Sequence, residues 1–311
     1  MQQVGLLLRS YADDFDYAKR LVQSFHVHNA DDLTLYIVVS EKDFEIFSQL
    51  AAPYVEVLSD THFSPYFTTC EVTGIRPGYI NQEIVKLAFW ELGLTENYFC
   101  VDSDAVFIRD FGESDFLAAD GYPYSVLVED KELKVEPRYF AEHWLSREES
   151  LQRIAREVGL TADVLLTCHG HQVFSAEVLR DFRDRFLAPR DWGYLDALRE
   201  APYEFSWYNF WLQANQSIPI HPREPLVKVF HHEGHHMESV LRGVTVEDLA
   251  RGYLAVVVNS NFSRDLGIIS TDEPQAATIA RYLSYSDLLR ALRAKVSLAL
   301  ASRLARSRRK P

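Results

Sequence analysis

The segment ENYFCVDSDAVFIRDF, residues 96–111, places two carboxylates inside an otherwise apolar stretch. The apolar run at 98–101 stops at Asp102 and Asp104, which are separated by one serine, and a second apolar run follows at once. Alternate residues of an extended chain point the same way, so both carboxylates can face one ligand. Because carboxylates at such a position are costly without a positive partner, the pattern predicts a strand that ends at a charged ligand such as a divalent cation.

The residues before this segment alternate between strand-like and helix-like patterns. The predicted strands are residues 4–8, 33–39, 54–58 and 98–101, and the predicted helices are residues 13–29, 41–51 and 79–92. Gly93 is expected to end the last helix. Strands that alternate with helices predict an α/β fold with a mostly parallel sheet covered on both faces. In such a sheet, ligands gather at the carboxyl ends of the strands, where Asp102 and Asp104 are placed.

The Asp-x-Asp segment resembles that of glycosyltransferases with the GT-A fold. The similarity extends to GYINQEIVKLAFWELG, residues 78–93, because the GT-A helix before the Asp-x-Asp strand often carries a Gln and a Lys, here Gln82 and Lys86. It covers about the first 110 residues well and the rest loosely. The resemblance implies a three-layer α/β/α sandwich whose first half binds a nucleotide-activated sugar.

The resemblance also implies roles for individual residues. Asp102 is expected near the ribose or the metal, and Asp104 is expected to ligate a Mn²⁺ or Mg²⁺ that bridges the diphosphate and to act in catalysis. The residues implied in donor binding are Arg9, Ser10, Tyr11, Gln82, Lys86, Asp102 and Ser103. Lys86 acts there as a point charge, although a solvated helix face explains a lysine at this position equally well.

A histidine cluster follows the strand-like run 226–230. The sequence LVKVFHHEGHHMES contains four histidines within six residues, a density that packing does not explain. GT-A enzymes commonly supply a late His to the metal or phosphate, and the resemblance makes His232 the first choice of metal ligand, with His236 as a possible phosphate contact.

Three other readings of the same residues stay open. His232, Glu233 and His236 match the H-E-x-x-H pattern of zinc metalloproteases, but Gly234 disfavours the required helix by about 1 kcal/mol. Asp102 and Asp104 also resemble the nucleophile and general acid of haloacid-dehalogenase-type phosphatases, a family that carries this motif on its first strand. A carbohydrate-binding protein without enzymatic activity is the third alternative.

The acceptor half is predicted from composition. The segment 167–175, which contains His169 and His171, resembles a GT-A acceptor-side strand in front of a helix at 176–187. The segment APYEFSWYNFWLQ at 201–213 concentrates aromatic and acidic side chains. Glu204 is the candidate base for an acceptor hydroxyl. His169, His171, Trp207 and Tyr208 are candidate acceptor-binding residues, although helical spacing also places Tyr208 in a core.

Composition sets the remaining expectations. The 311 residues carry a net charge of −13, and 47% are hydrophobic. Eight of the 32 basic residues lie in the last 24 positions, which contain no acidic residue, so the body carries −21 and is not suited to a nucleic-acid partner. Three widely spaced cysteines and an N-terminus that resembles a strand more than a signal peptide predict a cytoplasmic protein.

The domain organisation follows from these patterns. We expect a single domain at 1–286, with a nucleotide-binding half at 1–110 and an acceptor half at 111–286. Leucines and a valine recur every four residues in the basic tail at 287–311, which predicts an amphipathic helix that can lie on an anionic membrane surface. With the GT-A resemblance, this favours a metal-dependent glycosyltransferase acting on a glycan or lipid-linked acceptor at the inner membrane face, resembling enzymes of bacterial surface polysaccharide assembly.

Overall fold

A computed structural model describes residues 2–129, 145–168, 170–230, 236, 239–258, 289, 293 and 296. The chain divides into two compact units, which are described separately. The first unit comprises Met1–Ser103 and Asp110–Pro225, and the second comprises Asp104–Arg109 and Leu226–Pro311. No helix in the described part of the chain is both long enough and apolar enough to cross a membrane.

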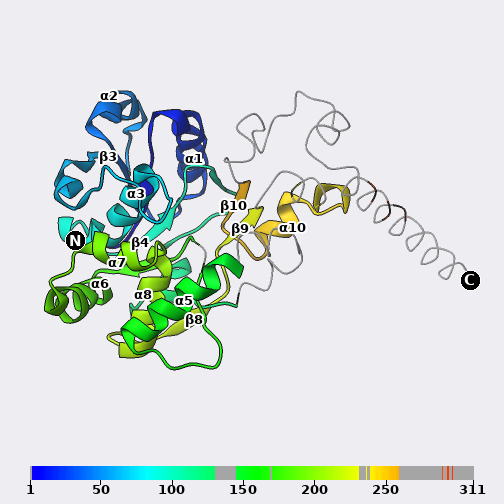
Figure 1. Ribbon diagram of the computed structural model, residues 1–311. Helices are drawn as coiled ribbons and strands as arrows, with labels where there is room; N and C mark the ends of the chain where they lie inside the picture. The colour runs from blue at the N-terminus through cyan, green and yellow to red at the C-terminus, as the bar shows by residue number, and fades with distance from the viewer. Residues whose placement is uncertain are drawn as a thin grey trace, which may run out of the picture. The chain divides into compact units, whose positions relative to one another are not determined.

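The first unit is built on a central sheet of five strands within the described residues, in the order β3-β2-β1-β4-β7. These strands are β1 (Gln2–Arg9), β2 (Leu35–Val39), β3 (Val55–Ser59), β4 (Thr95–Val101) and β7 (Val173–Ser175). The first four are parallel, and β7 runs antiparallel to β4. This confirms the predicted α/β architecture with a mostly parallel sheet flanked by helices (Figure 1).

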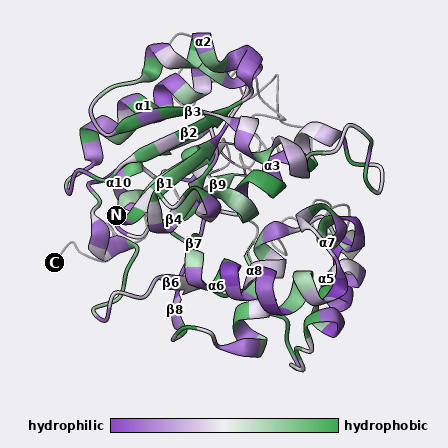
Figure 2. Ribbon diagram, turned by 90° about the vertical axis from the view of Figure 1, so that its left-hand side faces the viewer, coloured by the Kyte–Doolittle hydropathy of each residue, from purple (hydrophilic) through white to green (hydrophobic). Residues whose placement is uncertain are grey.

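Helices of the first unit follow the strands in sequence. They are α1 (Phe15–His28), α2 (Phe44–Phe47), α3 (Pro77–Ala88), α5 (Leu145–Val158), α6 (Ala176–Phe182), α7 (Tyr194–Glu200) and α8 (Glu204–Asn215). Short strands β6 (Tyr124–Val126) and β8 (His221–Arg223) pair beside them. The central strands are mostly hydrophobic, whereas hydrophilic residues concentrate on the helices (Figure 2).

The core of the first unit follows the alternation of each strand. Tyr98 and Cys100 of β4 face a large cluster with residues of α3, α6 and α8, whereas Phe99 points to the other face, against Phe116. Because successive side chains of a strand point to opposite faces, this pattern shows that both faces of the sheet are covered. Side chains therefore pack on both faces of β4 before the chain reaches Asp102.

Several boundaries differ from the sequence-based expectations. The predicted helix at 41–51 is α2 flanked by two short 3-10 helices, and its buried residues Phe47 and Leu50 are three positions apart, which suits the 3-10 repeat. Helix α3 begins at Pro77, two residues early, because proline is well suited to the first helical turn. Gly93 has φ +64° and ends this helical segment, as predicted.

The second unit contains a small sheet in the order β5-β10-β9 within the described residues. Strand β5 (Ala105–Phe107) is antiparallel to β10 (Ala255–Val258), which is parallel to β9 (Val227–Phe230). A short helix, α10 (Val246–Ala250), precedes β10. The second apolar run after the two aspartates therefore belongs to a different sheet from β4.

Gly5 shows how closely β1 and β2 approach. An added Cβ would lie 2.9 Å from Cε2 of Tyr36 and 3.2 Å from the carbonyl oxygen of Thr34. We expect Gly5→Ala to lower the free energy of unfolding by about 1–3 kcal/mol, because overpacking forces a packed ring to move. Gly78→Ala is the matched control: nothing lies within 4 Å of its added Cβ, and we expect a gain of about 0.5–1 kcal/mol. Urea denaturation of both variants measures the two effects; equal stabilities would contradict the prediction.

Candidate functional site

Polar side chains gather at the carboxyl ends of the parallel strands of the first unit. Arg9 ends β1, Asp43 follows β2, Asp60 follows β3 and Asp102 follows β4. Parallel neighbours bring these ends to one edge of the sheet, which is the position where open α/β sheets bind ligands.

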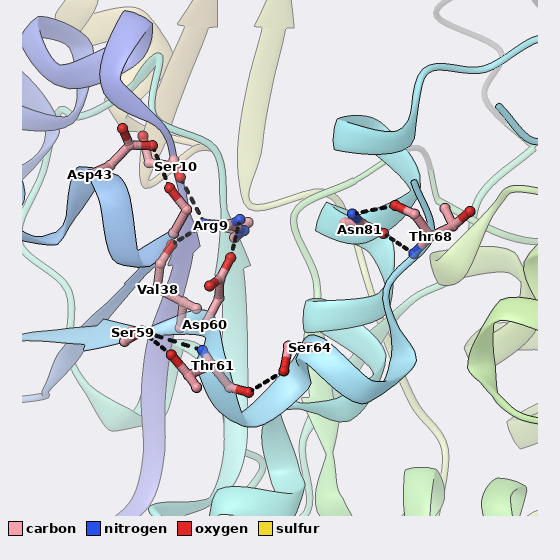
Figure 3. A network of polar contacts seen from close by, with 11 residues as sticks. Arg9, Ser10, Val38, Asp43, Ser59, Asp60, Thr61, Ser64, Thr68 and Asn81 are labelled. Atoms are coloured by element: carbon pink, nitrogen blue, oxygen red, sulfur yellow. Dashed lines mark hydrogen bonds and ion pairs between the residues drawn. The ribbon is translucent and has the colours of Figure 1, made fainter. Parts of the chain in front are cut away.

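Arg9 connects three of these strand ends (Figure 3). Its Nη2 lies 2.8 Å from Oδ2 of Asp60, and its Nη1 donates to the carbonyl oxygens of Val38 and Ser10. Burial lowers the pKa of Arg9 and raises that of Asp60, and in each case the charge of the partner opposes the shift. Because the usual pKa of arginine is far above neutrality, the guanidinium stays protonated at neutral pH.

The donor-binding role of Arg9 stays a prediction, since the geometry shows a structural role. Both Nη atoms are already hydrogen-bonded inside the first unit, so Arg9 joins the carboxyl ends of β1, β2 and β3. Ser10 is buried, and its Oγ has no partner among the described residues. Tyr11 is half-buried at the start of the short helix that leads into α1.

Lys86 is the centre of a second, mostly buried cluster. Its Nζ lies 3.1 Å from Oε1 of Glu204 and 3.5 Å from Oδ1 of Asp102. It also lies 4.8 Å from the centre of the Phe205 ring. Burial alone would lower the pKa of Lys86, but the charges of Asp102 and Glu204 outweigh burial and raise it, so the ammonium stays protonated.

Asp102 is the part of this cluster that reaches solvent, since its side chain is 39% exposed. Its Oδ2 lies 3.5 Å from Nε2 of His171. Burial would raise the pKa of Asp102, but Lys86 and then His171 lower it below the usual value, and the carboxylate is ionised. The pKa of His171 is lowered chiefly by burial, so its imidazole is neutral at neutral pH.

His171 is also held in a strained backbone conformation. Its φ of +58° lies in the left-handed region, which is uncommon for residues other than glycine. The side chain is buried, and its Nε2 forms no hydrogen bond with the described residues despite the nearby Asp102. Such strain is often retained where a side chain has to be held at a site, and here it brings the predicted acceptor residue next to the predicted donor residue.

Glu204 lies in the interior at the start of α8. Its side chain is only 6% exposed and accepts from Lys86. As a base for an acceptor hydroxyl it would need access to substrate, so this geometry supports a counter-ion role for Glu204 and leaves the base assignment a prediction.

The aromatic acceptor candidates are core residues in this structure. Trp207 is fully buried, and its indole N–H donates to the carbonyl oxygen of Ala201. Tyr208 is 2% exposed, and its hydroxyl accepts from the backbone N–H of Ser175. Neither ring presents a face on which a sugar could stack, because α8 is buried on most of its circumference and its aromatic residues fill the core.

The remaining predicted residues are placed as follows. Gln82 is half-buried on α3, one turn before Lys86, and Ser103 donates from Oγ to Oδ2 of Asp14. Asp104 is buried at the start of the second unit, directly before β5. His169, His232 and Glu233 lie outside the described residues, whereas His236 is described and its pKa is lowered by burial.

Metal binding stays a prediction on this donor set. Asp102 is ionised and partly exposed, and carboxylate oxygens suit a hard divalent cation. No group of three His, Cys, Asp or Glu residues in the described part of the chain is arranged to hold a metal. The predicted third ligand, His232, lies outside that part, as do the residues of the H-E-x-x-H alternative other than His236.

Sequence reasoning missed Glu83, Asp43 and Asp60. Glu83 stands between Ile80 and Ile84 on the buried side of α3, and a carboxyl group in that apolar pattern was a signal of a buried titratable group, although not of the residues opposite it. Asp43 and Asp60 carried a weaker signal, because acidic residues after a strand are common in turns.

Comparisons with known proteins add a family and a structural likeness. A model of the family described as "Family of unknown function (DUF6492)" matches residues 3–243. No curated protein matches the sequence at a significant level. One solved structure, apo mouse xyloside xylosyltransferase 1, is 11% identical, with 83% of this chain and 98% of that chain covered and a TM-score of 0.43.

Proposed function

Since the chain belongs to the family of unknown function DUF6492, whose description assigns no activity, we propose from its own residues that it is a metal-dependent glycosyltransferase. The observation that carries this proposal is the Lys86–Asp102 pair at the carboxyl end of β4. The sequence resembles the GT-A pattern at Gln82 and Lys86 on the helix before β4 and at the Asp-x-Asp pair after it. In the structure, Lys86 and Asp102 lie within 3.5 Å of each other.

The proposed substrate is a nucleotide-activated sugar, with a glycan or lipid-linked molecule as acceptor. The ionised Asp102 and the protonated Lys86 would orient the donor, and Lys86 would add a positive charge near its phosphates. Asp102 is proposed to hold a Mn²⁺ or Mg²⁺ ion, which would, when bound, stabilise negative charge on the diphosphate leaving group. Asp104 and His232 stay candidate ligands from the sequence. His171 lies beside Asp102 and is proposed to contact the acceptor.

Two finer expectations remain predictions from the sequence. One is a role in bacterial surface polysaccharide assembly. The other is attachment of the basic tail to the inner membrane face, since of the tail only Leu289, Arg293 and Val296 are among the described residues.

A thermal-shift panel of nucleotide sugars, with and without Mn²⁺, tests the proposed function. We expect one nucleotide class with Mn²⁺ to raise Tm by about 5 °C at a concentration of about a hundred times its Kd. The rise should disappear in Asp102→Asn and persist in Asp163→Asn, which changes an exposed aspartate distant in sequence. If no nucleotide changes the Tm of the wild-type protein, the proposal fails. Slow metal-dependent hydrolysis of the bound donor would show that the protein is an enzyme, because a binding protein without enzymatic activity does not hydrolyse it.

A further inference from the structure

Glu83 is a carboxyl group buried without an evident partner. It lies in the middle of α3 and is 1% exposed, and neither of its oxygens forms a hydrogen bond with the described residues. An ionised carboxylate in such a position carries a large desolvation cost, so the physical expectation is that the group holds a proton.

Its neighbour Glu204 is placed very differently. Glu204 is the first residue of α8, a twelve-residue helix, where the helix dipole stabilises a negative charge. It also accepts from Lys86 Nζ at 3.1 Å. The surroundings divide the two carboxyl groups: Glu204 accepts from the ammonium of Lys86, whereas Glu83 has no hydrogen-bond partner among the described residues and is the one expected to hold a proton.

The charged and titratable groups that face Glu83 agree with this division. They are Glu204 of α8, Tyr203 directly before it, Lys86 and Tyr79 of α3 and Arg147 of α5. Burial is the largest influence on the pKa of Glu83 and the charge of Glu204 the next, and together they raise it well above its usual value although Lys86 and Arg147 oppose them. Glu204 also acts through a side-chain contact, which falls short of a well-formed hydrogen bond.

We propose that Glu83 is a positioning residue: as a neutral carboxylic acid beside Glu204, it leaves Lys86 directed at Asp102. The proposal rests on the proposed function, because it concerns the group that would orient the donor. If Glu83 were ionised, two buried carboxylates would compete for one ammonium. The longer contact, 3.5 Å from Lys86 to Asp102, would be the first to be lost.

Infrared difference spectroscopy of the nucleotide-free protein tests the protonation state without any ligand. The wild-type protein at neutral pH is expected to show the carbonyl stretch of a protonated carboxylic acid, and Glu83→Gln is expected to lack it. Glu177→Gln, a change at an exposed glutamate of α6, should retain the band. A spectrum without such a band in the wild-type protein would overturn the proposal.

Thermal unfolding against pH gives a second measure on the same proteins. Above the usual glutamate pKa of 4.5, Glu83 in the unfolded chain releases its proton whereas the folded protein retains it, so this residue lowers stability as pH rises. The Tm of Glu83→Gln minus that of the wild-type protein should therefore increase with pH from about 4.5 upwards. The same difference for Glu177→Gln should stay flat, and a flat difference for Glu83→Gln would contradict the proposal.

The positioning role is tested by binding of the nucleotide sugar found in the panel. Wild-type affinity should fall about tenfold or more between mildly acidic and alkaline pH, and the fall should be mostly abolished in Glu83→Gln. An equal fall in both proteins would overturn the positioning role. If no nucleotide binds at any pH, the proposed function fails and the positioning role with it, while the spectroscopic result still decides the protonation state of Glu83.

Discussion

Replacing Lys86 with methionine is expected to lower metal-dependent hydrolysis or transfer of the nucleotide sugar by at least about a hundredfold, the usual effect of removing a preorganised charge from a site. Among the described residues, the ammonium of Lys86 forms an ion pair with Asp102 at 3.5 Å, and the other nearby nitrogen, Nε2 of His171, belongs to a neutral imidazole. Loss of the ammonium leaves Asp102 without a counter-charge at the position where the donor would bind.

The same substitution should also destabilise the fold, because it leaves the buried Glu204 without a partner. Removing one member of a buried ion pair costs about 3–5 kcal/mol. Lys86→Met combined with Glu204→Gln separates the two effects: we expect most of the stability to return, since the uncompensated charge is gone, while activity stays lost. Lys19→Met, at an exposed position of α1, is the control that should change neither measurement. Full activity in the doubly substituted protein would refute a role for Lys86.

Replacing Arg9 with methionine is expected to lower the free energy of unfolding by about 3–5 kcal/mol. The side chains of Arg9 and Asp60 are only 13% and 12% exposed, so the substitution leaves the Asp60 carboxyl group without its cationic partner in a poorly solvated position. It also removes the hydrogen bond by which Arg9 joins the end of β1 to the carbonyl oxygen of Val38. Urea denaturation followed by circular dichroism measures the loss.

Two further variants test whether the loss comes from the broken ion pair. In Arg9→Met with Asp60→Asn, the unpaired charge is absent, and most of the loss should be recovered. Arg199→Met breaks an exposed pair with Asp196, whose side chains are 57% and 37% exposed, and should cost at most about 1 kcal/mol. If Arg9→Met costs no more than Arg199→Met, the ion pair does not hold the strand ends together.

The candidate site was only partly predictable. Asp102 and Lys86 were found because a carboxylate at a strand end and a lysine on the preceding helix are local features. Their 3.5 Å approach involves residues 16 positions apart. Glu204, the buried partner of Lys86, is 118 positions from it in the sequence, and no local sequence pattern predicts that contact.

Trp207 and Tyr208 were predicted to bind the acceptor, but both lie in the core. Aromatic residues beside a carboxylate resemble a sugar-binding surface, but the same residues at helical spacing also form a core. The fold decides between the two, because α8 packs against α5, α6 and α3 and its aromatic side chains fill the space between them. Glu83 was missed for a related reason, since a single acidic residue in an apolar helix face says nothing about what lies opposite.

The amino-acid sequence by itself determined the alternation of strands and helices, the mostly parallel sheet and the placement of Asp102 at the end of β4. These follow from periodicity, turn residues and caps, which act over a few residues. The tertiary structure alone decided which charges meet: Arg9 with Asp60, Lys86 with Glu204, and His171 with Asp102. Those contacts join separate elements, and their energies depend on burial, which becomes defined only when the sheet and its covering helices have packed together.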